Sequence, residues 1–178
     1  MKYLGIVGSL RTGSFNQMLL HAVSGMLPAG DEFEEFDIGT LPFYNQDLET
    51  DFPAAARTLK EKIRAADALI IATPEFNRTM PGVLKNALEW ASRPHGDNAW
   101  EGKKVMVIGA SSGNISTALA QYDLKRVLLY LNARFEGQPE VMIGTVQDKF
   151  DGSGTLTDLA TKAFLEKSVA SFAAFAGK

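Results

Sequence analysis

The stretch Gly8-Ser-Leu-Arg-Thr-Gly-Ser-Phe-Asn16 decides how the fold of this 178-residue chain is interpreted. It follows the short apolar run Leu4–Val7 and precedes apolar residues at helical spacing, so it predicts a loop between a first strand and a first helix. Ser14 and Gln17 have the spacing of a capping box, which places the helix start near Ser14. The free N–H groups and the positive dipole end of such a helix start favour binding of an anion.

The side chains of this first loop narrow the choice of anion. Its two glycines have the GxxxxG spacing of a nucleotide P-loop, but Ser14 and Phe15 stand where Lys and Ser/Thr are required. The GxGxxG fingerprint of dinucleotide-binding turns is also absent. A monophosphate bound by hydroxyls, amide groups and the guanidinium of Arg11 remains. A polar loop that is merely rich in turn formers is the alternative interpretation.

Apolar runs and helical patterns alternate along the rest of the chain. Strands are expected at Lys2–Gly8, Glu32–Ile38, Asp67–Thr73, Gly102–Gly109 and Ala133–Glu136, the last resuming at Val141–Ile143. Helices are expected from Ser14 to about Met26, after Pro53, from Val83 to Ala91, from Ile115 to Leu131, and after a second capping box at Thr155 and Asp158. This alternation, without linker or repeat, predicts one domain over residues 1–178 with three α/β layers around a parallel sheet.

Composition excludes several classes of function. Hydrophobic residues make up 46% of the chain and charged residues 22%, as in an ordinary globular protein. The net charge of −3 argues against a nucleic-acid-binding protein. The chain has no cysteine and only two isolated histidines, so we expect no disulfide and no metal site. We find no signal peptide and no apolar run near the roughly 18 residues of a membrane span, and therefore expect a cytoplasmic protein.

Three loops are expected to converge on one ligand, because parallel α/β sheets bind ligands at the carboxyl ends of their strands. They are the first loop (Gly8–Asn16), the second loop (Pro74–Gly82) and the third loop (Ala110–Asn114). Two prolines stiffen the second loop, and its free backbone groups suit the edge of a planar heterocycle. A phosphate at one end and a planar ring held between two loops describe a flavin mononucleotide.

Two motifs resemble those of a known family. Gly8-Ser-Leu-Arg-x-Gly-Ser-x-Asn16 is similar to the phosphate loop of the NADPH-dependent FMN reductase family, the flavodoxin-like chromate and quinone reductases. Pro74-Glu-Phe-Asn-Arg-Thr-x-Pro-Gly-x-Leu-Lys-Asn-Ala-Leu-Glu-Trp90 resembles its second motif. The resemblance implies noncovalent FMN, strand order 2-1-3-4-5, and two-electron reduction of quinones by NADPH or NADH. Chromate, azo compounds or free flavin would be further acceptors.

The resemblance also assigns roles by position. The phosphate would be held by Ser9, Arg11, Ser14 and Asn16, and Phe15 would be a further cofactor-binding residue. The isoalloxazine ring would be framed by Pro74, Glu75, Phe76 and Asn77, and its far edge lined by Ser111, Ser112 and Gly113. Phe76 stands where the family usually has Tyr, and Asn114 follows Gly113 where paired glycines are usual. We expect these departures to affect nicotinamide docking and acceptor access more than flavin binding.

We expect no catalytic side chain, because hydride passes from nicotinamide to N5 of the flavin and then to the acceptor. Since one substrate at a time can stack on the exposed ring, ping-pong kinetics are expected. Glu75 is a candidate acid/base group, but a solvated or salt-bridged carboxylate is the favoured interpretation. His95 is expected to be a surface residue. Arg78 is expected at the mouth of the site, where a cation would attract an anionic nicotinamide cofactor.

Two alternatives remain open from the sequence, a flavodoxin-type electron carrier and an FMN-binding regulatory protein without turnover of its own. The choice between NADPH and NADH is open as well, because no 2′-phosphate pocket can be recognised. The resemblance implies a homodimer or homotetramer. Four aromatic residues that are hard to place in one core support that expectation, namely Phe43, Tyr44, Tyr122 and Tyr130.

Overall fold

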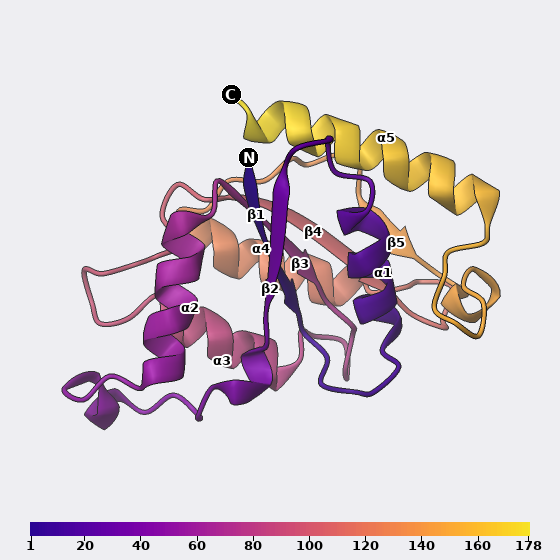
Figure 1. The fold of residues 1–178 in the computed structure, drawn as a ribbon. Coiled ribbons are helices and arrows are strands. Elements are labelled where there is room, and N and C mark those ends of the chain that lie inside the picture. The colour runs from indigo at the N-terminus through magenta and orange to yellow at the C-terminus, as the bar shows by residue number, and fades with distance from the viewer.

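The strand order confirms the sheet that the family resemblance implies. The structure, a computed structural model, describes the whole chain from Met1 to Lys178. Five parallel strands form one sheet in the order β2-β1-β3-β4-β5 (Figure 1). The strands are β1 (Lys2–Val7), β2 (Glu32–Phe36), β3 (Ala68–Ala72), β4 (Lys104–Ala110) and β5 (Val141–Ile143).

Helices cover both faces of this sheet (Figure 1). They are α1 (Phe15–Ser24), α2 (Ala54–Ala65), α3 (Gly82–Ala91), α4 (Ala118–Tyr130) and α5 (Leu159–Ala176), with 3-10 turns at Ile38–Thr40, Gln46–Glu49 and Val146–Asp148. Two separate clusters of buried side chains join α1 and α5 to one face, and α2, α3 and α4 to the other. The molecule is therefore a three-layer α/β sandwich of the flavodoxin-like type, as expected.

The central strand β3 shows why its sequence is continuously apolar. All five of its residues are buried. Leu69 and Ile71 belong to the cluster under α2, α3 and α4, whereas Ala68, Ile70 and Ala72 belong to the cluster under α1 and α5. Because successive side chains of a strand point to opposite faces, a strand covered on both faces needs an apolar residue at every position.

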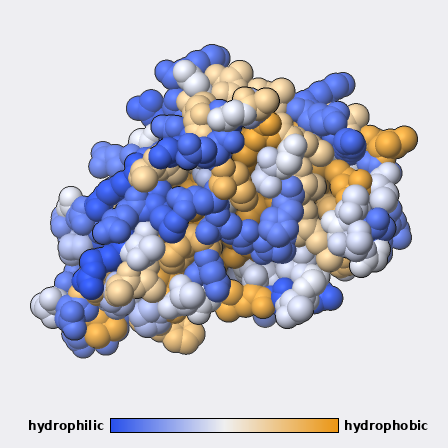
Figure 2. All heavy atoms as spheres, viewed as in Figure 1, coloured by the Kyte–Doolittle hydropathy of each residue, from blue (hydrophilic) through white to orange (hydrophobic).

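Strand β2 forms one edge of the sheet, and its sequence suits that position. It carries three exposed carboxylates, on Glu32, Glu34 and Glu35. Charged side chains on an edge strand oppose pairing with a strand of another molecule. Figure 2 shows hydrophilic side chains over the side of the molecule that carries α2.

The strand order reverses between β1 and β3, and this reversal locates the site. The chain passes from β1 to β2 on one side and from β3 to β4 on the other. Val7 lies opposite Ala72, and the N–H of Gly8 donates to the carbonyl of Ala72 at 2.8 Å. The first, second and third loops therefore leave the same edge of the sheet, where open α/β sheets bind ligands.

The last strand is shorter than the sequence indicated. Of the two segments expected, only Val141–Ile143 is a strand, and Ala133–Glu136 is not. Arg134 exchanges backbone hydrogen bonds with the start of β4 as an isolated bridge, and the pairing stops there. Pro139 follows and lacks the N–H that a ladder needs, so regular pairing resumes only beyond it.

Helix α5 begins later than expected because a carboxylate, and not a threonine, caps it. Asp158 is the N-cap residue, and its Oδ1 accepts the N–H of Thr161 at 2.9 Å. The N–H of Thr155 instead donates to Oδ1 of Asp151 at 3.0 Å, within a tight turn. A carboxylate also interacts favourably with the positive end of the helix dipole. Helix α4 likewise begins at Ala118, three residues after the expected Ile115.

Candidate functional site

The first loop presents a cluster of backbone donors that the protein itself does not use. None of the N–H groups of residues 12–16 donates to an acceptor in the chain. Gly13 has a φ of 69°, a left-handed conformation that a glycine adopts without steric cost. The cluster includes the start of α1, where N–H groups have no intrahelical acceptor. Such a set of donors at the positive end of a helix binds an anion.

Side chains of the first loop add to this donor set. The capping box expected from the sequence forms only in part. Ser14 caps α1 by accepting the N–H of Gln17 at 3.4 Å, and its own hydroxyl hydrogen remains free. Gln17 does not complete the capping box, since its amide contacts Glu35 at 2.7 and 2.8 Å. Arg11 is exposed, forms no ion pair, and lies over the ring of Phe15 at 5.9 Å from its centroid.

Asn16 has a more specific place than the sequence indicated. Its side chain is 3% exposed, and both amide atoms bind the backbone of Ala110 at the end of β4. The Nδ2 donates to the carbonyl of Ala110 at 3.0 Å, and the N–H of Ala110 donates to Oδ1 at 2.9 Å. The side chain therefore joins the first loop to the third, while the backbone N–H of Asn16 belongs to the free donor cluster.

An open hollow of ≈ 420 Å³ lies against the first loop. Ser9, Arg11 and Thr12 line it on one side, and the segment from Glu35 to Thr40 lines it on the other. Ser9 stands at its wall with Oγ accepting the N–H of Arg11 at 3.4 Å. Of the first-loop residues expected to bind the cofactor, Ser9 and Arg11 thus lie beside open space, whereas Ser14, Phe15 and Asn16 do not line this hollow.

The second loop turns tightly at its tip. Phe76 and Thr79 exchange backbone hydrogen bonds of 3.1 and 3.2 Å, and the two residues between them have left-handed backbones, with φ of 50° at Asn77 and 67° at Arg78. This is the geometry of a type I′ turn, in which Asn-Gly is the usual pair. The ring of Phe76 is 54% exposed, and Pro74 before it is buried.

Glu75 is neither a solvated carboxylate nor a free acid/base group. One oxygen, Oε2, accepts the N–H groups of Leu119 and Ala120 at the start of α4, at 2.9 and 3.1 Å. The other lies 3.5 Å from the guanidinium of Arg78, so that of the two states expected from the sequence, solvated or salt-bridged, the carboxylate adopts the second. Nothing in the sequence indicated the contact with α4, because the partners are 44 and 45 residues apart.

The third loop adds exposed backbone donors at the same edge of the sheet. Ser111 donates its N–H to the carbonyl of Ile143, and the N–H of Gly113 donates to Oγ of Ser111 at 3.2 Å. The N–H groups of Ser112, Asn114 and Ile115 have no acceptor in the chain. In the second loop the N–H groups at positions 75, 77 and 78 are free as well.

This donor set fits FMN. The phosphate matches the five free N–H groups of the first loop with the unpaired cation of Arg11, and the polar edge of the ring matches the free N–H groups of the other two loops. The chain has no cysteine, and no group of three or more His, Asp or Glu side chains is placed to hold a metal ion. None of the helices is both long and apolar enough to cross a membrane.

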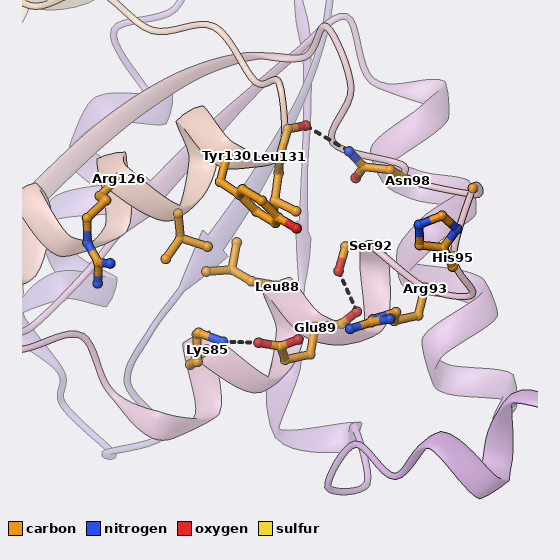
Figure 3. Close-up of a pocket in the computed structure, with 12 residues that line it drawn as sticks. Lys85, Leu88, Glu89, Ser92, Arg93, His95, Asn98, Arg126, Tyr130 and Leu131 are labelled. Atoms are coloured by element: carbon orange, nitrogen blue, oxygen red, sulfur yellow. Dashed lines mark hydrogen bonds and ion pairs between the residues drawn. The ribbon is translucent and has the colours of Figure 1, made fainter.

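A second hollow, of ≈ 590 Å³, is lined by residues of α3, α4 and the turn after α3, and by none of the three loops (Figure 3). Its apolar base includes Leu88 and Leu131, and charged side chains from both helices surround it. His95 is one of its lining residues, in the turn after α3. It is exposed, as the sequence predicted, and stands apart from the three loops.

The fold and these three loops define a flavodoxin-like protein with an FMN-type site. The sequence model of the family described as NADPH-dependent FMN reductase matches residues 1–148. The chain belongs to this family, and it is an oxidoreductase that uses FMN and a nicotinamide dinucleotide.

Individual relatives agree along nearly the whole chain. A 2-hydroxy-1,4-benzoquinone reductase of Burkholderia sp. is 45% identical over 175 residues, covering 98% of this chain and 96% of the relative. An NAD(P)H-dependent FMN reductase of Pseudomonas aeruginosa is 44% identical over 170 residues, covering 95% and 91%. The solved structure of FerB, a flavoenzyme NAD(P)H:(acceptor) oxidoreductase from Paracoccus denitrificans, superposes with a TM-score of 0.93 at 39% identity, covering 99% and 97%.

The unpaired guanidinium of Arg11 generates the first prediction. Replacing Arg11 with Ala should weaken FMN binding by about 1.5–3 kcal/mol, because the phosphate keeps its backbone donors but loses a charge-assisted partner. Fluorescence titration of FMN into the apoprotein measures this change. Arg57→Ala, which removes an exposed arginine on α2, is the matched control and should leave the dissociation constant unchanged. Equal constants for Arg11→Ala and wild type would contradict the role of Arg11.

Proposed function

We propose that this chain is an NAD(P)H-dependent quinone reductase that works by ping-pong hydride transfer with FMN held between the three loops. One observation carries the proposal: the free N–H groups at the start of α1 and those of the second and third loops lie at one edge of the sheet. The name of the Burkholderia relative supports a quinone as acceptor. Chromate, azo compounds and free flavin are further acceptors under this proposal.

Bound FMN supplies the hydride chemistry, and the protein supplies binding, orientation and electrostatics. The backbone N–H groups of residues 12–16, with Ser9, Arg11 and Ser14, would hold the phosphate. The free N–H groups of the second and third loops would serve the polar edge of the ring and stabilise negative charge that develops there. No side chain at this edge is a histidine or an unpaired carboxylate, so no acid/base residue is assigned.

Turnover distinguishes this proposal from an electron carrier or a regulatory protein. The purified chain loaded with FMN should oxidise NADPH or NADH continuously when a benzoquinone is present. Reciprocal plots at several quinone concentrations should be parallel, because the first product leaves before the acceptor binds. A chain that binds FMN but gives no turnover by itself would be a carrier or a regulator. Intersecting lines would contradict the ping-pong order.

Arg78 is proposed to attract the nicotinamide cofactor. Its side chain is 68% exposed at the tip of the second loop and is 3.5 Å from Glu75, so the pair leaves the guanidinium open to solvent on its outer side. The chain carries a net charge of −3, which opposes approach of a dinucleotide phosphate. A local cation beside the site raises the local concentration of an anionic ligand.

Substitution at position 78 therefore separates the two half-reactions. Arg78→Ala should raise KM for NADPH by about three- to tenfold at low salt, and the difference should shrink at high ionic strength because the attraction is screened. FMN affinity and reoxidation by a neutral quinone should change little. Arg78→Lys keeps the cation and is the matched control. Stopped-flow traces in which only quinone reduction slows would refute this role.

We also propose a homodimer formed through α4. The outward side of this helix carries Leu119, Tyr122, Leu129 and Tyr130, whose exposed fractions lie between 44% and 84%. An apolar row on the solvent side of a helix is typical of an interaction surface. Tyr130 also stands at the wall of the α3–α4 hollow (Figure 3). Tyr44 does not belong to this group, since it packs edge-on against Trp90 at 5.1 Å.

A charge on this row should separate the subunits. Leu129→Asp combined with Tyr130→Asp should give the mass of one chain in light scattering, because a buried unpaired carboxylate is costly in an interface. Leu159→Asp is the matched control, since Leu159 is 78% exposed at the start of α5, and it should keep the wild-type mass. A wild-type chain that is monomeric and fully active at assay concentration would contradict the proposal.

A further inference from the structure

Helix α4 lacks a cap from its own sequence. Thr117, the N-cap residue, accepts no backbone N–H of the helix with its side chain, and its Oγ1 instead accepts Nε2 of Gln121 at 3.0 Å. Helices α1 and α5, by contrast, begin with side-chain caps from Ser14 and Asp158. Free N–H groups at a helix start need an acceptor, and for α4 that acceptor comes from a distant loop. It is the Glu75 carboxylate, whose side chain is only 9% exposed.

A second contact fastens the other end of the same turn to α4. The hydroxyl of Thr79 donates to Oδ2 of Asp123, about one helical turn beyond Ala120. The hydrogen bonds from Thr79 and Arg126 lower the pKa of Asp123, so its carboxylate stays charged and remains an acceptor. Glu75 and Thr79 thus attach both sides of the second loop's tip to the first turns of α4.

Between these two contacts lies strained backbone. Asn77 and Arg78 both have left-handed conformations, and neither is glycine. An arginine in this region costs energy, and such conformations persist where surrounding contacts fix them. The backbone hydrogen bonds between Phe76 and Thr79 close this turn, and the contacts of Glu75 and Thr79 fasten it to α4.

We propose that Glu75 is a positioning residue that sets the separation between the second and third loops. Its carboxylate holds the tip of the second loop against the start of α4. Only three residues separate the third loop from α4, so this contact also links the second loop to the third. The two loops therefore keep the spacing that admits a flat ring. The inference rests on the proposed flavin site, and it assigns to Glu75 no contact with the reacting atoms.

Three variants test this role by FMN titration and by visible circular dichroism of the bound flavin. Glu75→Ala should weaken FMN binding by about tenfold and change the dichroism of the flavin bands, because a helix cap is lost beside the ring. Glu75→Gln keeps an oxygen acceptor for both N–H groups and should remain within about threefold of wild type. Asp158→Ala removes the carboxylate cap of α5, whose side-chain hydrogen bonds go to Lys149 and Thr161 and to no residue of the three loops, and should leave FMN binding within about twofold.

The Asp158 variant separates positioning from general loss of stability. Glu75→Ala and Asp158→Ala should both lower the melting temperature, but only the first should alter the flavin. Equal FMN affinities for Glu75→Ala and wild type would overturn the inference, as would equal losses in the Glu75→Ala and Asp158→Ala variants. A Glu75→Gln protein as weak as Glu75→Ala would overturn the hydrogen-bond account.

A second substitution tests the same contact from the other side. Thr79→Val removes only the hydroxyl that binds Asp123, and it should weaken FMN binding in the same direction, by a smaller factor. Combined with Glu75→Ala it should add less than its separate effect, because both changes release one turn. Independent, fully additive effects would overturn the inference. Failure of the wild-type chain itself to bind FMN would instead overturn the proposed function.

Discussion

The site depends on a pair of hydrogen bonds between the Asn16 amide and the backbone of Ala110. They join residues 94 positions apart, across the end of the sheet, and the amide is buried. Loss of either partner would leave a buried polar group unpaired, which is far more costly than a surface hydrogen bond. The first turn of α1 is therefore fixed relative to the end of β4. The free N–H groups of the first loop are therefore fixed in position as well.

The free N–H groups of the site are explained by asking which backbone N–H groups of the protein have acceptors. Within the sheet and helices nearly every N–H has a partner, as buried backbone requires. At the edge where β1, β3 and β4 end, the chain must leave the sheet, and there the N–H groups of residues 12–16 and six N–H groups of the two neighbouring loops, at positions 75, 77, 78, 112, 114 and 115, have none. Under the proposed function, a phosphate and the edge of a heterocycle would supply acceptors for them. Affinity for such a ligand thus follows from the position of the backbone N–H groups that have no acceptor within the protein.

The alternation of apolar runs and helical patterns made the fold predictable. Capping and turn residues made the positions of the loops predictable. The buried run of β3 and the cap at Ser14 can be recognised within a few residues, and both are confirmed. The errors fall where competing local partners decide, as at Asp158, or where proline interrupts pairing, as at Pro139. The partners of Asn16 and Glu75 could not be predicted, because they depend on how distant crossovers pack. The residue type of Asn16 and the family motif around Glu75 suggested ligand contacts, and the structure shows in addition that their side chains join elements of the protein.

The turn at Asn77 and Arg78 shows why a strained conformation is tolerable here. A glycine at position 78 would form the same type I′ turn with less steric cost. Arginine instead keeps a guanidinium at the edge of the site of an acidic chain, where a cation influences the approach of anionic molecules. The contacts of Glu75 and Thr79 with α4 offset the strain. The same contacts hold the second loop and place Arg78 at its tip, so the position of this loop and the charge that it carries are physically coupled.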